Sequence, residues 1–251
     1  MLEGKVIVVT GAARGIGRQY CVSFAQQGAA IVAADINSCD DTVQQIDAVL
    51  GRAISVQLDV SVMQSASAMA TRALDAYGRI DGLVNNAALY GTLHGGRFDA
   101  LDEREWDAAM AVNVKGLWHC CKAVVPAMRD TGGGSIVNVS SLAATYGMPF
   151  ALHYTTSKAA VIGLTRGLAR ELGRDDIRVN CIAPSAVLTE GTREFFGAKH
   201  DKALETIRRG QFIERNLEAV DLVGTVAWLL SDASTFVTGQ TISIDGGTVL
   251  L

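Results

Sequence analysis

The chain has 251 residues, of which 49% are hydrophobic and 19% are charged, a composition that favours one globular domain with a large core. The net charge is −4 and no basic block is present, so nucleic acid and anionic membrane are excluded as expected partners. The first strand-like run begins at Lys5, which leaves no room for a signal peptide, and no apolar stretch nears the roughly 18 residues that cross a bilayer. We therefore expect a cytoplasmic protein.

Seven short runs rich in Val and Ile alternate with longer segments of helical period. They are residues 5–10, 30–35, 53–58, 80–85, 135–140, 177–182 and 241–245. Runs such as VIVVT and SIVNV are apolar almost throughout, which is typical of strands covered on both faces. The alternation predicts an α/β fold with a doubly wound parallel sheet (Rossmann-like) of about seven strands and helices on both faces. No linker divides the chain, so we expect a single domain spanning 1–251.

A glycine-rich turn, TGAARGIG, follows the first predicted strand. Gly11, Gly15 and Gly17 stand where this strand gives way to a helix, so the backbone can approach a pyrophosphate held at the helix N-terminus. The spacing is G-x-x-x-G-x-G rather than G-x-G-x-x-G, and a tight turn without a ligand is the alternative interpretation.

Three charged residues are candidate contacts of a dinucleotide held by such a turn, and the first two bear on the choice between NAD and NADP. Asp35 ends the second predicted strand, where a carboxylate accepts hydrogen bonds from an adenosine ribose and repels a 2′-phosphate, so it favours NAD over NADP. Arg14 is an opposing signal, because a guanidinium pairs with a 2′-phosphate, although a solvated surface charge is the other interpretation. Asp59, after the third predicted strand, either bonds an adenine amino group or caps the helix that follows.

The cysteines and histidines do not predict a metal site. The five cysteines are scattered, odd in number and without ligand spacing, which fits reduced thiols. Cys39, just past the second strand, is interpreted as core filler rather than as a reactive thiol. His94 and His153 have no ligand partners near them in the sequence, so surface or indirect roles are expected.

Tyr154 stands four residues before Lys158, and Ser141 stands thirteen residues before Tyr154. Residues four apart share a helix face, so the phenol and the ammonium are predicted to lie side by side. A tyrosine must move by roughly three pKa units to act near neutrality, which is about 4 kcal/mol. One cation about 4 Å away supplies an energy of that size at an effective dielectric near 20. The pair is therefore a candidate acid/base.

Residues 185–215 break the alternation of strands and helices. This segment is polar and mixed in pattern, and it follows the sixth predicted strand. A long excursion at the carboxyl edge of a parallel sheet lies where ligand crevices form, so we predict that it is a lid over the ligand.

Taken in order, these motifs resemble the short-chain dehydrogenase/reductase family over essentially the whole chain. They are the glycine turn TGAARGIG, Asp35, NNAA at 85–88, Asn113 in AVNVKG, Ser141 in IVNVSS, Tyr154 with Lys158, APSAVLT at 183–189 and TGQTISIDGG near the end. Chance can supply one of these motifs but not the ordered series.

The resemblance implies an NAD-dependent alcohol dehydrogenase or ketone reductase with a catalytic Ser, Tyr, Lys and Asn. By that resemblance, Ser141 bonds the substrate oxygen, and Tyr154 takes the hydroxyl proton as the hydride passes to the nicotinamide. Lys158 would lower the pKa of the tyrosine and hold the nicotinamide ribose, and Asn113 would position a water. Ser140 competes with Ser141 for the catalytic role, and we choose Ser141 because the family places that serine thirteen residues before the tyrosine.

The cofactor contacts implied by the resemblance come from the glycine turn, the strand ends and the start of the predicted lid. They are Gly11, Arg14, Gly15, Ile16, Gly17, Asp35, Asp59, Val60, Asn86, Ala87, Tyr154, Lys158, Pro184, Val187 and Thr189. Two positions depart from the family pattern: Ala88 replaces the last Gly of NNAG, and Ser185 replaces the Gly after Pro184. Both departures put the shape of the pocket in doubt rather than the chemistry.

The side chains expected to face the nicotinamide are mostly apolar. They are Tyr90, Leu142, Phe150, Phe195 and Phe196, together with Leu89, Ala144 and Met148. An apolar set favours a cyclic, aromatic or otherwise apolar secondary alcohol or ketone over a polyol. Ordinary packing between lid and body is the alternative interpretation of Phe195 and Phe196.

Two other functions stay open. An NADPH-dependent 3-oxoacyl thioester reductase has the same fold and catalytic group, with Asp35 as the evidence against it. A nucleotide-binding regulatory protein without turnover is the non-enzyme alternative, and the complete catalytic set argues against it. The resemblance also implies a homotetramer or homodimer packed through the helix after VNVKG and the helix that carries Tyr154.

Overall fold

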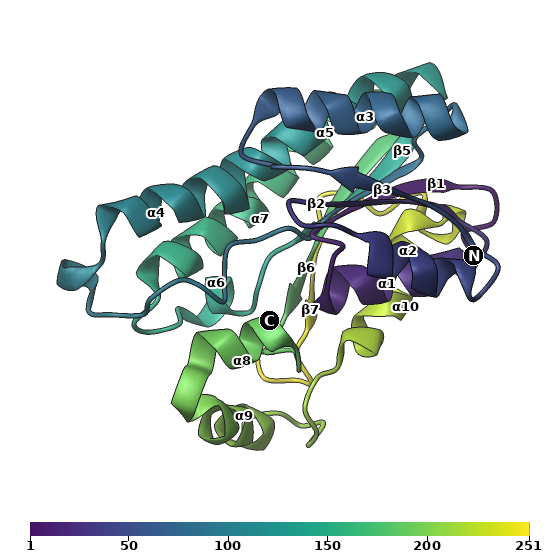
Figure 1. The fold of residues 1–251 in the computed structure, drawn as a ribbon. Coiled ribbons are helices and arrows are strands. Elements are labelled where there is room, and N and C mark those ends of the chain that lie inside the picture. Colours follow the sequence, from purple (N-terminus) through teal and green to yellow (C-terminus); the bar gives the residue numbers. More distant parts are fainter. Residues whose placement is uncertain (251) are drawn as a thin grey trace.

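The computed structural model describes residues 1–250, and its centre is a parallel sheet of seven strands between two layers of helices (Figure 1). The strand order is β3-β2-β1-β4-β5-β6-β7, and each neighbouring pair is parallel. The direction of winding reverses between β1 and β4, as in a doubly wound sheet. The predicted fold class is therefore confirmed.

The strands and helices have the following bounds. The strands are β1 Val6–Thr10, β2 Ala30–Asp35, β3 Arg52–Gln57, β4 Gly82–Asn85, β5 Gly134–Val139, β6 Ile177–Pro184 and β7 Thr241–Ile244. The α-helices are α1 Gly15–Ala25, α2 Asp40–Asp47, α3 Met63–Tyr77, α4 Glu103–Met110, α5 Gly116–Asp130, α6 Ala143–Tyr146, α7 Leu152–Leu172, α8 Glu190–Phe196, α9 His200–Arg209 and α10 Ala219–Leu230. A π-helical turn, Ala111–Lys115, joins α4 to α5, and short 3-10 turns lie at Phe98–Ala100, Gly173–Asp175, Gly197–Lys199 and Asp232–Ser234.

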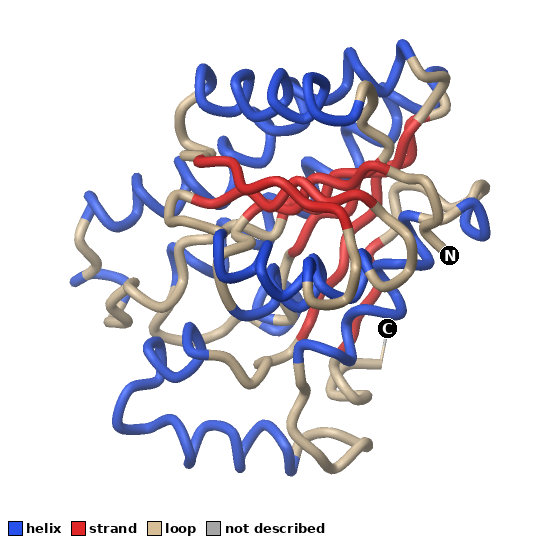
Figure 2. The backbone as a smooth tube through the Cα atoms, turned by 45° about the vertical axis from the view of Figure 1, so that its right-hand side comes forward, coloured by secondary structure: helices blue, strands red, loops and turns tan. Residues whose placement is uncertain are grey.

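Successive residues of β1 supply two separate cores, one on each face of the sheet. Ile7 and Val9 pack in the core that contains side chains of α1 and α10. Val6 and Val8 pack in the core that contains side chains of α3, α5 and α7. Figure 2 shows the strands enclosed between these helices. Burial on both faces explains why the strand runs are apolar almost throughout.

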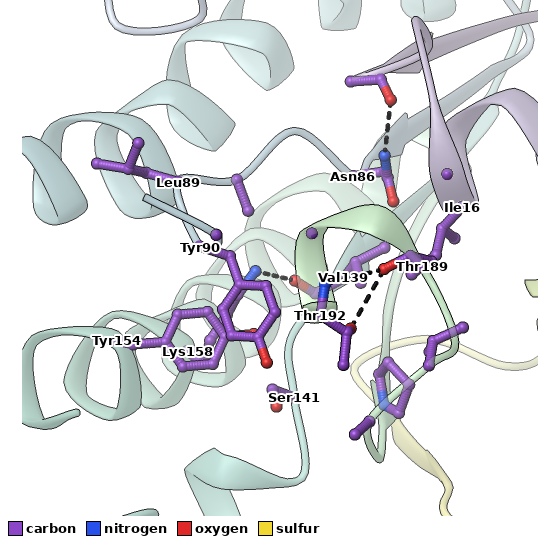
Figure 3. Close-up of a pocket in the computed structure, with 18 of the residues that line it drawn as sticks. Ile16, Asn86, Leu89, Tyr90, Val139, Ser141, Tyr154, Lys158, Thr189 and Thr192 are labelled. Carbon is purple, nitrogen blue, oxygen red and sulfur yellow. Dashed lines mark hydrogen bonds between the residues drawn. The ribbon is translucent and has the colours of Figure 1, made fainter. Parts of the chain in front are cut away.

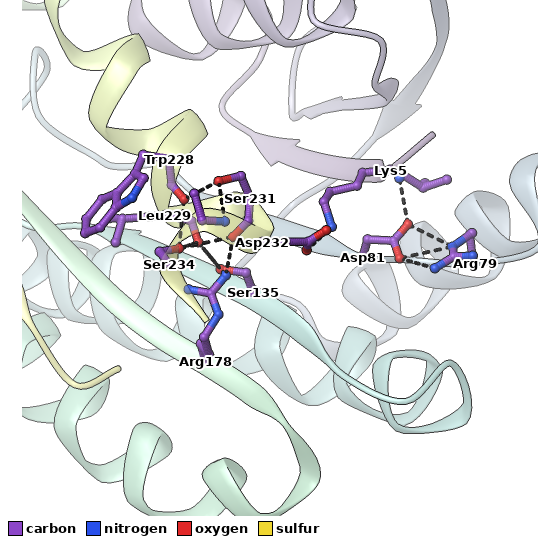
Figure 4. A network of polar contacts seen from close by, with 12 residues as sticks. Lys5, Arg79, Asp81, Ser135, Arg178, Trp228, Leu229, Ser231, Asp232 and Ser234 are labelled. Carbon is purple, nitrogen blue, oxygen red and sulfur yellow. Dashed lines mark hydrogen bonds and ion pairs between the residues drawn. The ribbon is translucent and has the colours of Figure 1, made fainter. Parts of the chain in front are cut away.

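Polar contacts fix the end of α10 against the amino ends of β5 and β6 (Figure 4). Arg178 donates hydrogen bonds to the carbonyl oxygens of Leu229 (2.8 Å) and Ser231 (3.1 Å). The hydroxyl of Ser135 also donates to the Leu229 carbonyl, at 2.7 Å. These donors satisfy carbonyl groups that the last turn of a helix leaves without partners. The network therefore supports the fold at the edge of the sheet opposite to the carboxyl ends of the strands.

The segment 185–215 leaves the sheet after β6 and forms α8 and α9 beyond the carboxyl ends of the strands (Figure 1). Leu204 is the buried residue of α9, whose other side chains are at least partly exposed. This amphipathic pattern accounts for the polar and mixed sequence of the segment.

The cysteines are structural. All five are unpaired and buried, and burial raises the pKa of the Cys39 thiol to about 12. A thiol with so high a pKa carries little thiolate near neutral pH, so the interpretation of Cys39 as core filler agrees with the structure. Within residues 1–250, no helix is both long enough and apolar enough to cross a membrane.

Candidate active site

A cavity of about 540 Å³ lies at the carboxyl ends of the central strands. Gly11 follows β1, Asn86 follows β4, Ser140 follows β5 and Ser185 follows β6, and all four residues line it. In an open α/β sheet, ligands bind in the crevice where the winding reverses, which here is the gap between β1 and β4. The cavity is therefore the candidate functional site.

Most of the residues assigned from the sequence line this cavity. They are Gly11, Arg14, Gly15, Ile16, Asp35, Asp59, Val60, Asn86, Ala87, Tyr90, Ser141, Leu142, Tyr154, Lys158, Pro184, Val187, Thr189 and Phe196. Gly17, Asn113, Phe150 and Phe195 do not line it. The cavity also has lining residues that the sequence analysis did not single out, among them Ile36, Asn37, Thr192, Ile207 and Thr248.

The glycine turn fits a pyrophosphate. Gly15 lines the cavity with φ +57, and a Cβ at this position would come no closer than 3.7 Å to another protein atom, on Thr189. The helix α1 begins there, with no side-chain cap from Arg14 and no acidic residue in its first turn. A free helix N-terminus beside an open glycine is the arrangement that binds phosphate groups.

Gly17 has a different role within the turn. A Cβ on Gly17 would overlap the carbonyl oxygen of Gly11 and would lie 2.8 Å from Nδ2 of Asn86. Asn86 donates hydrogen bonds from this nitrogen to the carbonyl oxygens of Thr10 (2.9 Å) and Gly11 (3.2 Å). Gly17 and Asn86 thus hold the turn in shape rather than facing the cavity with a free polar group.

Asp35 stands at the end of β2 with both carboxylate oxygens bonded to nearby backbone. Oδ2 accepts a hydrogen bond from the Ala13 amide (3.1 Å), and Oδ1 accepts one from the Asn37 amide (2.9 Å). These bonds fix the carboxylate beside the glycine turn and on the cavity wall. A negative charge held there repels a second negative charge brought to the same place.

Asp59 does not cap α3. The helix has Val62 at its N-cap position without a side-chain cap, whereas Oδ1 of Asp59 accepts hydrogen bonds from the amide (2.9 Å) and hydroxyl (2.6 Å) of Ser61. The capping interpretation is therefore wrong, because a turn separates Asp59 from the start of the helix. Asp59 lines the cavity.

Arg14 reaches across the cavity mouth to α8. Its guanidinium forms two hydrogen bonds with the Glu194 carboxylate, at 2.6 and 2.9 Å. This bonding raises the pKa of Arg14 and lowers that of Glu194. The two residues lie 180 positions apart in the sequence, so no local pattern reveals the pair.

Tyr154, Lys158 and Ser141 converge on one side of the cavity (Figure 3). Tyr154 and Lys158 lie one turn apart in α7, and both are buried. Nζ of Lys158 donates a hydrogen bond to the carbonyl oxygen of Val139 at 2.9 Å, which anchors the ammonium to the end of β5. Ser141, just beyond that strand, lies near enough to Tyr154 for its hydroxyl to lower the pKa of the phenol.

Burial dominates the titration of this group. It raises the pKa of Tyr154 to about 12, against the smaller lowering effect of the hydrogen bond with Ser141. It also lowers the pKa of Lys158 to about 8, because a desolvated ammonium is unfavourable. The lowering of the tyrosine pKa by Lys158, which the resemblance implies, stays a prediction, because desolvation is the largest effect on the pKa of Tyr154 in this structure.

The structure distinguishes the two adjacent serines. The hydroxyl of Ser140 is buried and donates to the backbone carbonyl of Lys158 at 2.7 Å. Ser141 is partly exposed, and its hydroxyl accepts a hydrogen bond from the Ala143 amide at 3.2 Å. Ser140 thus braces α7 against β5, and Ser141 is the serine associated with the Tyr154 phenol.

Asn113 lies in the π-helical turn and is fully buried behind the cavity. Its side chain accepts a hydrogen bond from the Leu89 amide (2.7 Å) and donates to the Leu89 carbonyl (3.0 Å) and to the Ser157 hydroxyl (3.1 Å). Both amide hydrogens are therefore used in joining the loop after β4 to α7.

An aromatic wall lies beside the phenol of Tyr154. Tyr90 stacks on Phe195 with ring centroids 4.4 Å apart, and its other neighbour is Tyr154, at 4.9 Å. Phe195 thus reaches the site through Tyr90 rather than by lining the cavity itself, while Phe196 lines the cavity. The two lid phenylalanines meet edge to face at 5.3 Å.

Phe150 is not part of this wall. Its φ is +62, 67% of the residue is exposed, and it does not line the cavity. The sequence assignment of Phe150 to the pocket is wrong, because Phe150 lies in an exposed stretch of chain before α7 and does not line the cavity. No sequence signal distinguishes this phenylalanine from Phe195.

His153 is fully buried next to Tyr154. Its Nδ1 accepts a hydrogen bond from the Tyr154 backbone amide at 2.7 Å, and its Nε2 lies 3.8 Å from the Glu105 carboxylate. His94 is exposed and bonds the same carboxylate at 2.5 Å. The expected surface role for His94 and indirect role for His153 agree with these positions. Within residues 1–250, no group of His, Cys, Asp and Glu side chains is arranged to hold a metal ion.

The two departures from the family pattern both line the cavity. Ala88 is exposed there, so its methyl group faces open space. Ser185 accepts a hydrogen bond from Gln211 at 3.5 Å, which joins the start of the 185–215 segment to its end. The serine at this position therefore adds a tie to the segment that glycine would lack.

Comparison with known proteins gives matches along almost the whole chain. The family described as enoyl-(acyl carrier protein) reductase matches residues 11–249. The 3-oxoacyl-[acyl-carrier-protein] reductase FabG of Thermotoga maritima is 39% identical over 251 residues, which cover 99% of each chain. A probable galactose dehydrogenase GalD of Rhizobium meliloti is 38% identical over 98% of this chain and 95% of its own. The crystal structure of levodione reductase superimposes with a TM-score of 0.91 at 30% identity and covers 98% of both chains.

Proposed function

This chain belongs to the short-chain dehydrogenase/reductase family, whose members are oxidoreductases that use a nicotinamide cofactor, and we propose that it transfers a hydride between NAD(H) and an apolar secondary alcohol or ketone. The observation that carries the proposal is the meeting of Ser141, Tyr154 and Lys158 in the cavity that the glycine turn opens. A binding protein without turnover has no need of a phenol and an ammonium buried together at the end of a nucleotide cleft.

The chain offers a contact for each part of a dinucleotide. The N-terminus of α1 with Gly15 would hold the pyrophosphate, and Asp35 would accept the hydroxyls of the adenosine ribose. Lys158 would hold the nicotinamide ribose. The remaining proposed contacts are Ile16, Asp59, Val60, Ala87, Pro184, Val187 and Thr189, all on the cavity wall. Bound in this way, the cofactor supplies the hydride acceptor or donor.

The proposed chemistry of the side chains follows from their positions. In the oxidative direction, the phenolate oxygen of Tyr154 takes the proton of the substrate hydroxyl as the neighbouring C–H bond breaks and the C=O bond forms. Ser141 donates a hydrogen bond to the same substrate oxygen and holds it against the phenol. Lys158 favours the phenolate by its charge. In the reductive direction, Tyr154 returns the proton to the carbonyl oxygen.

NAD is the proposed cofactor. Asp35 is fixed on the cavity wall by two backbone hydrogen bonds, so it cannot turn away from a group placed at the 2′ position of the ribose. Hydroxyls at that position satisfy the carboxylate, whereas a phosphate brings like charges together.

The proposed substrate is cyclic, aromatic or otherwise apolar. Tyr90, Leu142, Met148 and Phe196 line the cavity near the catalytic tyrosine, and Phe195 backs Tyr90. A polyol would need several paired polar groups on this wall. The 185–215 segment is proposed to close over the substrate as a lid.

An NADPH-dependent 3-oxoacyl thioester reductase is the second candidate. It is favoured by the similarity to the 3-oxoacyl-[acyl-carrier-protein] reductase FabG and by Arg14 on the cavity wall. Asp35 opposes it, and so does the pairing of Arg14 with Glu194, which occupies the guanidinium.

We also propose that the protein is cytoplasmic and assembles as a homotetramer or homodimer through α5 and α7. Exposed apolar side chains on both helices support the assembly, with Trp118 45% exposed and Leu152 43% exposed. Sedimentation equilibrium of the purified protein tests it, because a monomer at micromolar concentration would contradict it.

The deciding experiment follows the absorbance of the reduced nicotinamide with NAD or NADP against aryl, cyclic, steroidal, polyol and 3-hydroxyacyl alcohols. Turnover with NAD on an apolar secondary alcohol supports the proposal. Turnover only with NADP on hydroxyacyl thioesters supports the second candidate. Tyr154→Phe is the control, and we expect it to abolish turnover and to change NADH affinity by no more than a few fold. Retained turnover would remove Tyr154 from the mechanism.

A further inference from the structure

Arg14 is a positive charge on the cavity wall, close to Asp35. The basic residues on the described part of the cavity wall are Arg14 and Lys158, and Lys158 is buried with Tyr154 at the catalytic end. Arg14 is adjacent to Ala13, whose amide bonds the Asp35 carboxylate. A phosphate placed beside Asp35 would therefore need Arg14 as its counter-charge.

Other cations nearby are already committed. Arg18, one turn further along α1, donates hydrogen bonds to the Ala13 carbonyl and to the Thr42 hydroxyl, and it does not line the cavity. The acidic residues on the wall are Asp35, Asp59 and Glu190. On the described part of the wall these three carboxylates outnumber the cation at this end, so the cofactor end of the cavity has a net negative charge, which the guanidinium of Arg14 offsets only in part.

Glu194 decides where that guanidinium points. Its two carboxylate oxygens match the two terminal nitrogens of Arg14, at 2.6 and 2.9 Å, which is the bidentate geometry that a phosphate would also use. One arginine cannot form this fork with two partners at once. A 2′-phosphate must therefore compete with Glu194 as well as overcome Asp35.

The helix that carries Glu194, α8, is held in position by other residues. The residue after Glu194, Phe195, stacks on Tyr90. At the start of the helix, the Thr189 hydroxyl accepts a hydrogen bond from the Thr192 amide at 3.2 Å. These contacts do not involve the Glu194 side chain. Loss of the carboxylate should therefore free Arg14 and leave α8 in position.

From this geometry we infer that Glu194 is a positioning residue for cofactor selection: by pairing with Arg14 it withholds the cation that a 2′-phosphate needs, and so excludes NADP. The inference rests on the proposed use of a nicotinamide cofactor with Asp35 facing the adenosine ribose. It assigns to the lid a part in choosing the cofactor, because the selecting carboxylate belongs to α8 rather than to the cofactor end of the sheet.

The test measures the dissociation constants of NADH and NADPH by fluorescence titration, so that no substrate is needed. The variants are Glu194→Gln, Arg14→Ala and the double substitution. We expect Glu194→Gln to tighten NADPH binding about fivefold, the equivalent of a strong exposed ion pair, and to change NADH binding less than twofold. In the Arg14→Ala background, Glu194→Gln should have no effect on either cofactor, because the guanidinium through which it acts is gone.

Glu205→Gln is the matched control. Glu205 is a lid carboxylate on α9 that pairs with Arg208 and Arg209 and does not line the cavity. This variant removes the same charge and the same kind of ion pair, and it should leave the NADPH to NADH ratio unchanged. An equal gain in NADPH binding by Glu205→Gln would overturn the inference in favour of a general effect of lid charge.

The remaining outcomes separate the inference from the proposed function. Wild-type protein that prefers NADH, with no gain for Glu194→Gln, overturns the inference and leaves the proposed function standing. Wild-type protein that prefers NADPH overturns both, because neither Asp35 nor Glu194 then excludes the phosphate. A gain for Glu194→Gln that persists in the Arg14→Ala background also overturns the inference, since the effect would not pass through Arg14.

Discussion

The ammonium nitrogen of Lys158 lies over the ring of Tyr154, 5.7 Å from the ring centroid. Its hydrogen bond goes to the Val139 carbonyl instead of the phenol. Both groups are buried, and desolvation moves the pKa of each away from its usual value, that of Tyr154 upward and that of Lys158 downward. Several measurable consequences follow from this relationship and from the geometry around it.

Lys158→Met should stabilise the protein at neutral pH. Burial lowers the pKa of Lys158 from 10.5 to about 8, so between these values the unfolded chain binds more protons than the folded one and stability rises with pH. Below pH 8 the full desolvation cost is present, and removing the amine should raise the free energy of unfolding by up to about 3 kcal/mol. Urea denaturation at pH 7 and at pH 10 checks this. The gain should be smaller at pH 10, and a loss of stability at pH 7 would contradict the assigned cost.

Ser141→Ala should raise the pKa of Tyr154 further. Burial already raises it to about 12, and the hydrogen bond with Ser141 opposes that rise. A tyrosine pKa above its unfolded value of 10.0 favours the folded state below pH 10, and this contribution is lost as the pH rises toward 12. The phenolate absorbance is measured against pH for the wild-type protein and for Ser141→Ala. Subtracting the curve of the same protein with Tyr154→Phe leaves the titration of Tyr154 alone. An unchanged titration in Ser141→Ala would show that the serine does not reach the phenol.

Asp35→Ser should widen the cofactor range toward NADP. In the wild-type protein the Ala13 amide donates a hydrogen bond to the Asp35 carboxylate at 3.1 Å. The serine hydroxyl of the variant is expected to accept the same kind of bond, but the negative charge is gone. Because like charges in contact cost several kcal/mol, we expect the NADP to NAD ratio of kcat/KM to rise roughly 100-fold. Steady-state kinetics with both cofactors checks this. A ratio that stays within a few fold of wild type would mean that Asp35 does not face the ribose.

Gly15→Ala should weaken NADH binding, with Gly78→Ala as its matched control. Both glycines have positive φ, +57 and +73, and a Cβ finds space at either position in the protein alone. Each substitution should cost about 1–2 kcal/mol of stability through backbone strain. Gly15 lines the cavity beside the start of α1, whereas Gly78 caps α3. NADH affinity should therefore fall at least about tenfold only in Gly15→Ala, because the methyl group meets the pyrophosphate there.

Equal NADH affinity in Gly15→Ala and Gly78→Ala would contradict the proposed pyrophosphate site. Thermal denaturation of both variants is measured alongside the titrations, so that a loss of fold is not mistaken for a loss of binding.

Phe195→Ala should impair turnover of bulky apolar ketones, with Phe150→Ala as its control. Phe195 supports Tyr90, which in turn contacts Tyr154, with ring centroids at 4.4 and 4.9 Å. An aromatic pair contributes about 0.5–1.5 kcal/mol beyond its buried area, so the KM for a cyclic ketone should rise up to roughly tenfold. Phe150 is exposed outside the cavity, and its removal should change the KM less than twofold. Similar KM values for the two variants would contradict the assignment of Phe195 to the substrate wall.

The fold and the local chemistry were accessible from the sequence because they depend on short-range periodicity. Alternating apolar runs predicted the parallel sheet, and their bounds agree with the observed strands to within a few residues. Tyr154 and Lys158 share a face of α7 because four residues make about one helical turn. The glycine turn and Asp35 follow strands, and parallel strands bring their carboxyl ends to one edge.

Other features were decided only by packing between distant segments. Phe150 and Phe195 were both assigned to the pocket from the sequence, yet Phe150 is exposed outside the cavity and α8 places Phe195 against Tyr90. Arg14 is an ambiguous charge until Glu194, 180 positions away, fixes its direction. The pKa values of Tyr154 and Lys158 depend on how much water the folded chain removes around them. Periodicity therefore determines which residues can meet, whereas desolvation and pairing arise only when segments remote in sequence enclose the same space.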